Sequence, residues 1–574
     1  MTLIFLLSFT FFFSLFIFVN AEISFACMTI LVGKKASSTG EVLIGHNEDA
    51  PGRFTMQTHL VHKLRRRSGM KIKFEHELSE LGLSSTRTNL FWSEARTFST
   101  DDSDSAFCDL YVNGHGVIIC SNNCANSRED QPELINGGIG YGLRRLVAET
   151  SHTAREALDT ACKLVDKYGY ASGGRSYAFS DKDEIYVMQI VHGKHYAIQR
   201  VPDDEVCVIP NHYTIHEPDP KAHGYDELVS YAVQRGWYDP SEGAFDFAKV
   251  YQSEDSYGLE KNTYRHVRAF EILLEMDLSE LLNRKWEHLP FSIKPAHKVN
   301  VDMLRKILRS YKPTKPITIC NSDTLESTIA EIRHNPDRII LRRALGRPCF
   351  SPYLVWYSGI NEIPEGYEYM KADEALSTHF HVRPGDMDYR YNAWFRAMEV
   401  QAACDILYHE KGEYVRSKIV EFEAHEEEKL NTLDSQIELR FHNEPRIARA
   451  MMFGALKTFA DESEELMNDI KRELGIVTAE ALSNVRIKEG FRIRIRKQDF
   501  GIKECICGTS YKNQSEWSKC IGINDNGEYT ELNFDSGKWI DDAVPCFTDL
   551  YMKMIDDNGN VHAGTVRIQV EGGK

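Results

Sequence analysis

Cys27 is the residue whose neighbours best suit it to nucleophilic chemistry. It follows Ser24-Phe25-Ala26, which places small residues at the −3 and −1 positions that signal peptidase prefers, and Val19-Asn20-Ala21 is a competing cleavage site. Cleavage before Cys27 makes it the N-terminal residue. Its α-amino group, with a reference pKa of about 7.7–8.0, then takes the proton of the thiol, whose reference pKa is about 8.5. Such a nucleophile needs no catalytic histidine.

A predicted β-hairpin over residues 27–49 brings a carboxylate to this thiol. Its two arms are rich in β-forming residues, and residues 37–40 are typical of a turn. In a hairpin centred near residue 38, the numbers of opposing residues sum to about 76, so we expect Asp49 to return beside Cys27 and hold its ammonium group. The alternative is that Cys27 is half of a disulfide and Asp49 a turn residue.

Strands and helices are indicated around this hairpin. Strand character appears at 109–120, 177–190 and 195–200, with turns after Asn113 and near 181–183, and helical periodicity runs from 141 to 165 with a cap at Thr153. Strands, then helices, then strands indicate an α+β fold in which helices cover the sheets.

The C-terminal part of the chain changes character twice. Residues 391–473 are helical and amphipathic, and the acidic run at 421–430 is interpreted as a solvated helix face. Beyond about residue 485, the strictly alternating run 491–496 and two Asn-Gly turns indicate hairpins. Four of the 13 cysteines fall there, so the sequence predicts a small disulfide-supported β module.

The chain also resembles the C69 dipeptidase family. Cys27-Met-Thr-Ile-Leu-Val-Gly and Asn47-Glu48-Asp49 match its start. Colinear blocks follow as far as about residue 400, beginning at Gly140, Ala178, Arg200, Val208, Leu289, Glu326, Arg343 and Trp356. The family consists of N-terminal-nucleophile (Ntn) hydrolases similar to bacterial dipeptidase A, with secernins and the bile-salt and penicillin V acylases as relatives.

The resemblance implies a fold and a domain organisation. It implies an Ntn-hydrolase αββα sandwich over residues 27–395, with two stacked sheets between helical layers, and a helical extension over 396–480. Residues 1–26 are expected to be a signal or pro segment, and the β-rich module at 481–574 lies outside the resemblance.

The resemblance also implies roles for residues of the first hairpin. Cys27 corresponds to the nucleophile and supplies the base through its amine, Asp49 holds the α-ammonium group, and Asn47 belongs to the same Asn-x-Asp turn. Relatives usually carry Arg before this turn, whereas this chain has His46. Because histidine favours the thiolate only when protonated, we expect higher activity on the acidic side of neutral than in an Arg-bearing relative.

Further roles are implied outside the hairpin. Oxyanion-hole asparagines of related acylases correspond to Asn211 and to Asn123, with Asn122 as its neighbour. Arg265, in the context Asn262-Thr-Tyr-Arg265, is expected to orient Cys27 or to bind the substrate carboxylate. The alternatives are that Asn211 shapes a turn after Pro210 and that Arg265 is an ion-pair partner at the surface.

Composition limits the compartment and the partners. The net charge of −17 argues against nucleic acid as a partner. The uncharged segment 3–19 is interpreted as a cleaved secretory signal, with an uncleaved anchor as the alternative, so we expect an extracellular or lysosome-like location without a stable membrane anchor. Asn513 begins a glycosylation sequon, and one catalytic thiol would leave twelve cysteines for up to six disulfides.

Three functions remain open on the sequence. The first is a cysteine dipeptidase that acts through an acyl-enzyme on dipeptide substrates; the second is an Ntn amidohydrolase acting on N-acyl amides. The third is a non-catalytic, secernin-like interaction protein in which Cys27 never becomes N-terminal. A homo-oligomer is possible, and no zinc-type, nucleotide-binding or P-loop spacing is present, so no cofactor or metal is expected.

Overall fold

The computed structural model describes residues 27–571 apart from several internal segments. These gaps are residues 50–53, 69–70, 74–77, 81–85, 98–106, 125–126, 129–133, 141, 255, 284–287, 312–317, 369–392, 408–410, 483–484, 487–489, 497, 499, 509–516 and 535–545. The expected signal segment and the sequon at Asn513 therefore lie outside the described residues.

The hairpin of β1 (Met28–Val32) and β2 (Val42–Asp49) lies at the centre of a seven-stranded antiparallel sheet. Its strand order is β13-β12-β1-β2-β14-β15-β16. The other strands are β12 (Val206–Ile209), β13 (Ser292–Ile293), β14 (Thr324–Ile332), β15 (Ile340–Leu345) and β16 (Leu354–Tyr357). Every residue of β1 and β2 is buried, because other layers cover both faces of these central strands.

A second seven-stranded sheet has the order β11-β10-β9-β8-β7-β6-β3. Its strands are β3 (Phe54–Arg66), β6 (Thr86–Thr97), β7 (Phe107–Asn113), β8 (Ile118–Asn123), β9 (Tyr170–Ser180), β10 (Ile185–Gly193) and β11 (Tyr196–Arg200), while β4 (Lys71–Lys73) and β5 (Leu78–Glu80) pair separately. The predicted turns after Asn113 and near residues 181–183 are confirmed.

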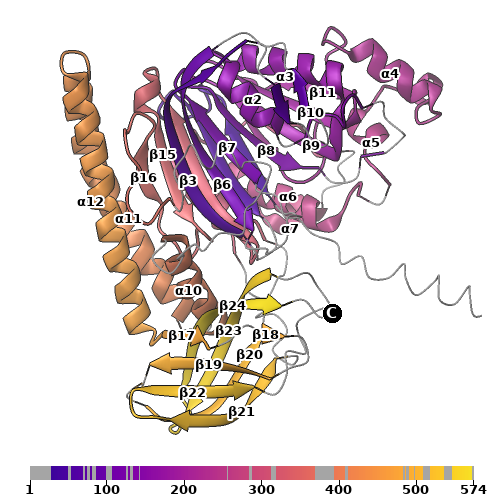
Figure 1. Cartoon of the computed structure of the whole chain (residues 1–574). Helices are drawn as coiled ribbons and strands as arrows, with labels where there is room; N and C mark the ends of the chain where they lie inside the picture. Colours follow the sequence, from indigo (N-terminus) through magenta and orange to yellow (C-terminus); the bar gives the residue numbers. More distant parts are fainter. Residues whose placement is uncertain are drawn as a thin grey trace, which may run out of the picture.

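The two sheets stack on one hydrophobic core and carry helices on their outer faces (Figure 1). Leu31 and Ile44 of the first sheet meet Val112 and Ile118 of the second between the layers. Helices α2 (Gly142–Thr150) and α3 (Ala154–Tyr168) cover the second sheet, and α6 (Glu260–Leu274) and α8 (Val301–Leu308) cover the first. The predicted mixture of sheets and covering helices is confirmed.

The helical periodicity predicted over 141–165 is confirmed, and it corresponds to two helices, α2 and α3. The expected cap is confirmed, since the side chain of Thr153 accepts a hydrogen bond from the backbone N–H of Glu156 at the start of α3. The shorter elements that complete this part are α4 (Tyr225–Gln234), η1 (Pro240–Glu242), α5 (Phe247–Tyr251), α7 (Leu278–Asn283) and η2 (Pro336–Arg338).

Three helices follow the sandwich. They are α10 (Ala393–Ile406), α11 (Glu413–Phe441) and α12 (Pro445–Glu473), and the last two form a long hairpin along the β16 side of the first sheet (Figure 1). The interpretation of 421–430 as a solvated face is wrong in part. Glu423 and Glu426 are buried, because α11 packs its acidic side onto arginines that include Arg305 and Arg309.

A third, eight-stranded sheet forms the C-terminal module. Its order is β17-β19-β22-β21-β20-β23-β24-β18, with bounds β17 (Val477–Ala481), β18 (Val485–Arg486), β19 (Phe491–Arg496), β20 (Ile502–Gly508), β21 (Ser518–Asp525), β22 (Tyr529–Phe534), β23 (Cys546–Asp556) and β24 (Val561–Glu571). The alternation predicted for 491–496 is confirmed, since its apolar residues are buried and Arg492 and Arg496 are exposed. The module packs against α10 through a cluster that includes Ala563 of β24 (Figure 1).

The expected disulfides are not seen among the described residues. Eleven cysteines there are in the thiol form, including Cys505, Cys507 and Cys520 of the C-terminal module. The Sγ atoms of Cys320 and Cys349 lie 3.0 Å apart, in contact but unbonded. In the part of the chain that the structure describes, no helix is both long and apolar enough for a membrane crossing.

Candidate active site

The register of the first hairpin places Glu48, not Asp49, across from Cys27. Met28 pairs with Asn47 and Thr29 with His46, so the numbers of opposing residues sum to 75 rather than 76. The predicted register was therefore wrong by one residue. Because side chains alternate between faces, Glu48 joins Cys27 on one face: the Cys27 thiol lies 3.7 Å from Glu48 Oε1 and 3.6 Å from the backbone oxygen of Asp49.

Asp49 lies near the thiol, but its carboxyl is held by the next strand and the loop before it. Its Oδ2 accepts a hydrogen bond of 2.5 Å from the Asn321 amide. Burial raises the pKa of Asp49 to about 7, against the opposing effect of hydrogen bonds from Thr324 and Asn321 and of the Arg265 charge. A cation beside this carboxyl, such as an α-ammonium group, would favour its ionised form.

Arg265 of α6 joins the hairpin to the segment after β12. It is fully buried, and its Nη1 donates to the backbone oxygen of Cys27 at 2.9 Å. Its Nη2 donates to Asn211 Oδ1 at 2.8 Å and to Asn262 Oδ1 at 2.7 Å. The predicted alternative of a surface ion-pair partner is therefore excluded for Arg265.

The asparagines come together at the end of β8. Asn211 Nδ2 donates to the backbone oxygen of Asn123 at 2.7 Å, so Asn211 touches both Arg265 and the β8 end. Asn122 faces the hairpin instead: its Oδ1 accepts from Thr29 Oγ1 at 2.5 Å, and its Nδ2 donates to the Ile209 oxygen at 2.9 Å.

His46 lies in the same buried layer as Cys27 and Glu48. Its Nδ1 is 2.7 Å from Thr29 Oγ1, and its Nε2 is 3.4 Å from Glu48 Oε2. Thr29, His46 and Glu48 are each no more than 3 % exposed, so bulk water does not screen this group.

The side chain of Asn47, a predicted site residue, points away from Cys27. Its Nδ2 donates to the backbone oxygens of Leu308 and Ile319, at 3.1 and 3.3 Å, on the α8 side of the sheet. The structure thus brings Asp49, Asn211, Arg265, His46 and the Asn122–Asn123 strand end around Cys27 while Asn47 anchors the hairpin to the outer layer.

Glu48, Thr29, Asn262 and Asn321 were missed by the sequence reasoning. A signal for the first two was present: Cys27-x-Thr29 and His46-x-Glu48 have the spacing that puts residues on one face of a strand. Asn262 lies three residues before Arg265 in the quoted motif, a spacing that lets the two side chains meet on one helix. Asn321 gave no such signal, because its contact with Asp49 depends on the tertiary packing of separate elements.

Among the described residues, one further group could hold a metal. His216, Asp246 and His288 bring possible ligand atoms within 4.8 Å of one another, and two imidazoles with a carboxylate are a set that zinc accepts. Both Asp246 oxygens lie 3.0 Å from His216 Nδ1, and Oδ1 also accepts from the Lys249 N–H as a cap of α5. These bonds account for the position of the carboxylate without an ion.

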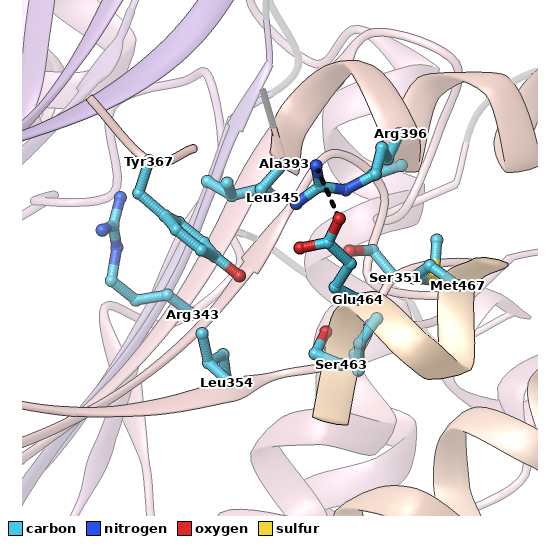
Figure 2. Close-up of a pocket in the computed structure, with 12 residues that line it drawn as sticks. Arg343, Leu345, Ser351, Leu354, Tyr367, Ala393, Arg396, Ser463, Glu464 and Met467 are labelled. Atoms are coloured by element: carbon cyan, nitrogen blue, oxygen red, sulfur yellow. Dashed lines mark ion pairs between the residues drawn. The ribbon is translucent and has the colours of Figure 1, made fainter. Parts of the chain in front are cut away.

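A pocket away from Cys27 lies between the ends of β15 and β16 and helices α10 and α12 (Figure 2). Its lining includes Arg343, Tyr367 and an ion pair of 3.3 Å between Arg396 and Glu464. Its volume of about 30 Å³ suits ordered water and is too small for a dipeptide.

A family model and several relatives match this chain. The model of peptidase family C69 matches residues 26–383. A probable dipeptidase of Latilactobacillus sakei is 26% identical over 378 residues, which cover 60% of this chain and 76% of that protein. A probable dipeptidase of Salmonella dublin is 24% identical over 375 residues, covering 59% and 83%.

A structural comparison finds a single-residue variant of a conjugated bile acid hydrolase from Clostridium perfringens. The TM-score is 0.31 and the sequence identity 13%, and the match covers 56% of this chain and 89% of that chain.

Proposed function

This chain belongs to peptidase family C69, and from that premise we propose that it is an Ntn-type cysteine dipeptidase whose nucleophile is Cys27. The observation that supports the proposal is that Asp49 and Arg265 contact this buried cysteine at the start of a central strand, while Asn211 binds Arg265. Probable dipeptidases among its relatives support the choice of substrate.

In the proposed reaction, removal of the residues before Cys27 frees its α-amine. The amine takes the proton of the thiol, and the thiolate attacks the peptide carbonyl to give an acyl-enzyme that water hydrolyses. Asp49 holds the α-ammonium group, and Arg265 fixes the backbone of Cys27 through its oxygen. Asn211 and Asn123, at the β8 end, supply amide donors toward the oxyanion, while the amide of the neighbouring Asn122 binds the Ile209 oxygen.

The proposed location is the lumen of the secretory pathway, outside the cell or in a lysosome-like compartment. It rests on the apolar segment 3–19 and the small residues before Cys27.

The test combines mass spectrometry of the mature N-terminus with Cys27→Ala, assayed on dipeptides and on N-acyl amides. We expect a chain that begins at Cys27, dipeptide hydrolysis, and a loss of at least about a hundredfold in kcat for the variant. Cys520→Ser, in the C-terminal module, is the matched control and should keep full activity.

Two results of this experiment would change the proposal. Turnover confined to N-acyl amides would replace the dipeptidase by an amidohydrolase. A native chain that begins elsewhere, together with turnover undiminished in Cys27→Ala, would overturn the nucleophile itself.

A further inference from the structure

A continuous chain of buried polar groups leads from the Cys27 thiol through Glu48 and His46 to Thr29 and Asn122. The steps measure 3.7 Å from Sγ to Glu48 Oε1, 3.4 Å from Glu48 Oε2 to His46 Nε2, 2.7 Å from His46 Nδ1 to Thr29 Oγ1 and 2.5 Å from there to Asn122 Oδ1. None of these residues is more than 3 % exposed. The chain lies on the face of the hairpin opposite to the Asn47 side chain.

The far end of the chain fixes where the protons lie. Asn122 Nδ2 donates to the Ile209 backbone oxygen, so its Oδ1 faces Thr29 and can only accept. The single hydroxyl proton of Thr29 is used in that bond. Thr29 Oγ1 therefore accepts from His46, and Nδ1 of the imidazole carries a proton.

At the Cys27 end of this chain of polar groups, one more proton is required, between His46 and Glu48. Nε2 of His46 faces a carboxylate oxygen of Glu48, and a lone pair on each atom would repel the other. One proton between them gives either imidazolium with carboxylate or imidazole with carboxylic acid. In the first state, Glu48 Oε1 accepts from the Cys27 thiol while the imidazolium supplies a buried positive charge.

Other charged groups around this pair are largely matched. Glu326 of β14 stands opposite Glu48 in the register and pairs with Arg343 of β15 at 2.8 Å. From α6, Arg265 binds the Cys27 backbone oxygen, and Asp49 holds its hydrogen bond to Asn321. Among the described residues, the imidazole of His46 contacts Glu48 and becomes a positive group when it is protonated.

We propose that Glu48 is a second base for the thiol, beside the α-amine, and that His46 is the positioning residue that keeps it ionised. The inference rests on Cys27 being the nucleophile. In the step, the S–H bond breaks, its electron pair stays on sulfur, and the proton forms the O–H bond of the Glu48 carboxylic acid. That proton passes to the leaving amine nitrogen when the peptide C–N bond breaks.

The sign of the pH dependence follows from the charge of His46. A proton on Nε2 would make His46 a cation beside Glu48 and favour the carboxylate, so a neutral glutamine in its place should move the acidic limb of kcat/KM to higher pH. Loss of this proton at higher pH would remove the cation in contact with Glu48, and activity should then fall. A permanent cation in His46→Arg should therefore remove this alkaline limb and leave the acidic limb in place.

The experiment compares Glu48→Gln, His46→Gln and His46→Arg in the mature protein. Glu48→Gln should lower kcat about a hundredfold, the lower range for a lost acid–base group, because the α-amine remains. Glu41→Gln, at the opposite end of the same hairpin, is the control and should match the parent. Circular dichroism and thermal melting of each variant report folding, and Glu48→Asp, which keeps a carboxylate, should recover part of the activity if Glu48→Gln folds poorly.

The outcomes separate this inference from the proposed function. If Cys27→Ala is inactive but Glu48→Gln is fully active, the role of Glu48 is overturned and the nucleophile stands. The role of His46 is overturned in the same way if the pH profiles of His46→Arg and the parent superpose. An active Cys27→Ala would overturn the nucleophile, whatever Glu48→Gln does.

Discussion

Burying the ionised carboxylate of Asp49 lowers the stability of the folded protein, by an amount that depends on pH. Its folded pKa of about 7 lies above the ordinary value of 3.8 because the group is fully buried. The stability that Asp49 contributes is therefore fully present below about pH 4 and is lost as pH rises through about 7, at about 1.4 kcal/mol per pKa unit. An α-ammonium group on Cys27 would offset this cost, so releasing that amine is expected to stabilise the ionised site.

Asn321→Ala tests the support of this carboxyl. Loss of the donor at Asp49 Oδ2 raises the pKa of Asp49 further, so the acidic limb of kcat/KM should move to higher pH while the alkaline limb stays in place. Asn300→Ala is the matched control, since Asn300 caps α8 by accepting from Met303 N–H. An acidic limb that does not move in Asn321→Ala would show that this hydrogen bond does not govern activity.

For individual residues, the sequence predicted which residues lie close to Cys27 better than it predicted on which face of the strand their side chains lie. The hairpin arithmetic brought residue 49 to Cys27, and the structure places the Asp49 backbone oxygen 3.6 Å from the thiol. An error of one residue in the register hid Glu48, because such a shift exchanges the two faces of a strand. Turn geometry sets that register, and composition alone did not reveal it.

Among the elements, α11 shows how tertiary partners override a charge pattern. Its acidic run meets arginines of α8 and of the first sheet: Glu423 pairs with Arg309, and Glu427 with Arg305 and Arg342. Glu423 Oε1 also accepts from the Tyr353 backbone N–H at 2.7 Å. The sequence of α11 shows only the glutamates of these pairs and not the arginines, so a solvated face was the reasonable expectation.

Glu423→Ala should destabilise the protein by about 3–5 kcal/mol, because it leaves buried arginine without its carboxylate. The matched control is Glu421→Ala on the same helix, where the side chain is 79% exposed and the change should stay within about 0.5 kcal/mol. Thermal or denaturant unfolding measures both. Equal losses in the two variants would mean that the buried pairs add nothing to stability.

For the whole molecule, the sequence predicted those elements that leave a local pattern in it. Alternating strands, the cap at Thr153 and the long C-terminal helices all lie where the pattern predicts them. The pairing of β17 with both β19 and β24, and the packing of β24 on α10, join residues far apart in the chain. Such contacts leave no periodicity in one sequence, so the order of the third sheet could not be derived.

From the contact between Cys320 and Cys349 we expect the molecule to respond to its redox surroundings. Cys320 directly precedes Asn321, and its sulfur would need to move about 1 Å to reach the disulfide length of about 2.05 Å. Oxidised glutathione should convert the two thiols into one disulfide and release two reduced glutathiones, which peptide mapping without reduction detects. Cys404→Ser, in the same cluster, should leave the crosslink intact, and a map without it would refute the expectation.

Such a crosslink would tether the turn after β15 to the loop whose amide holds Asp49. Catalysis would then respond to the oxidation state of the compartment as well as to its acidity, through one and the same carboxylate.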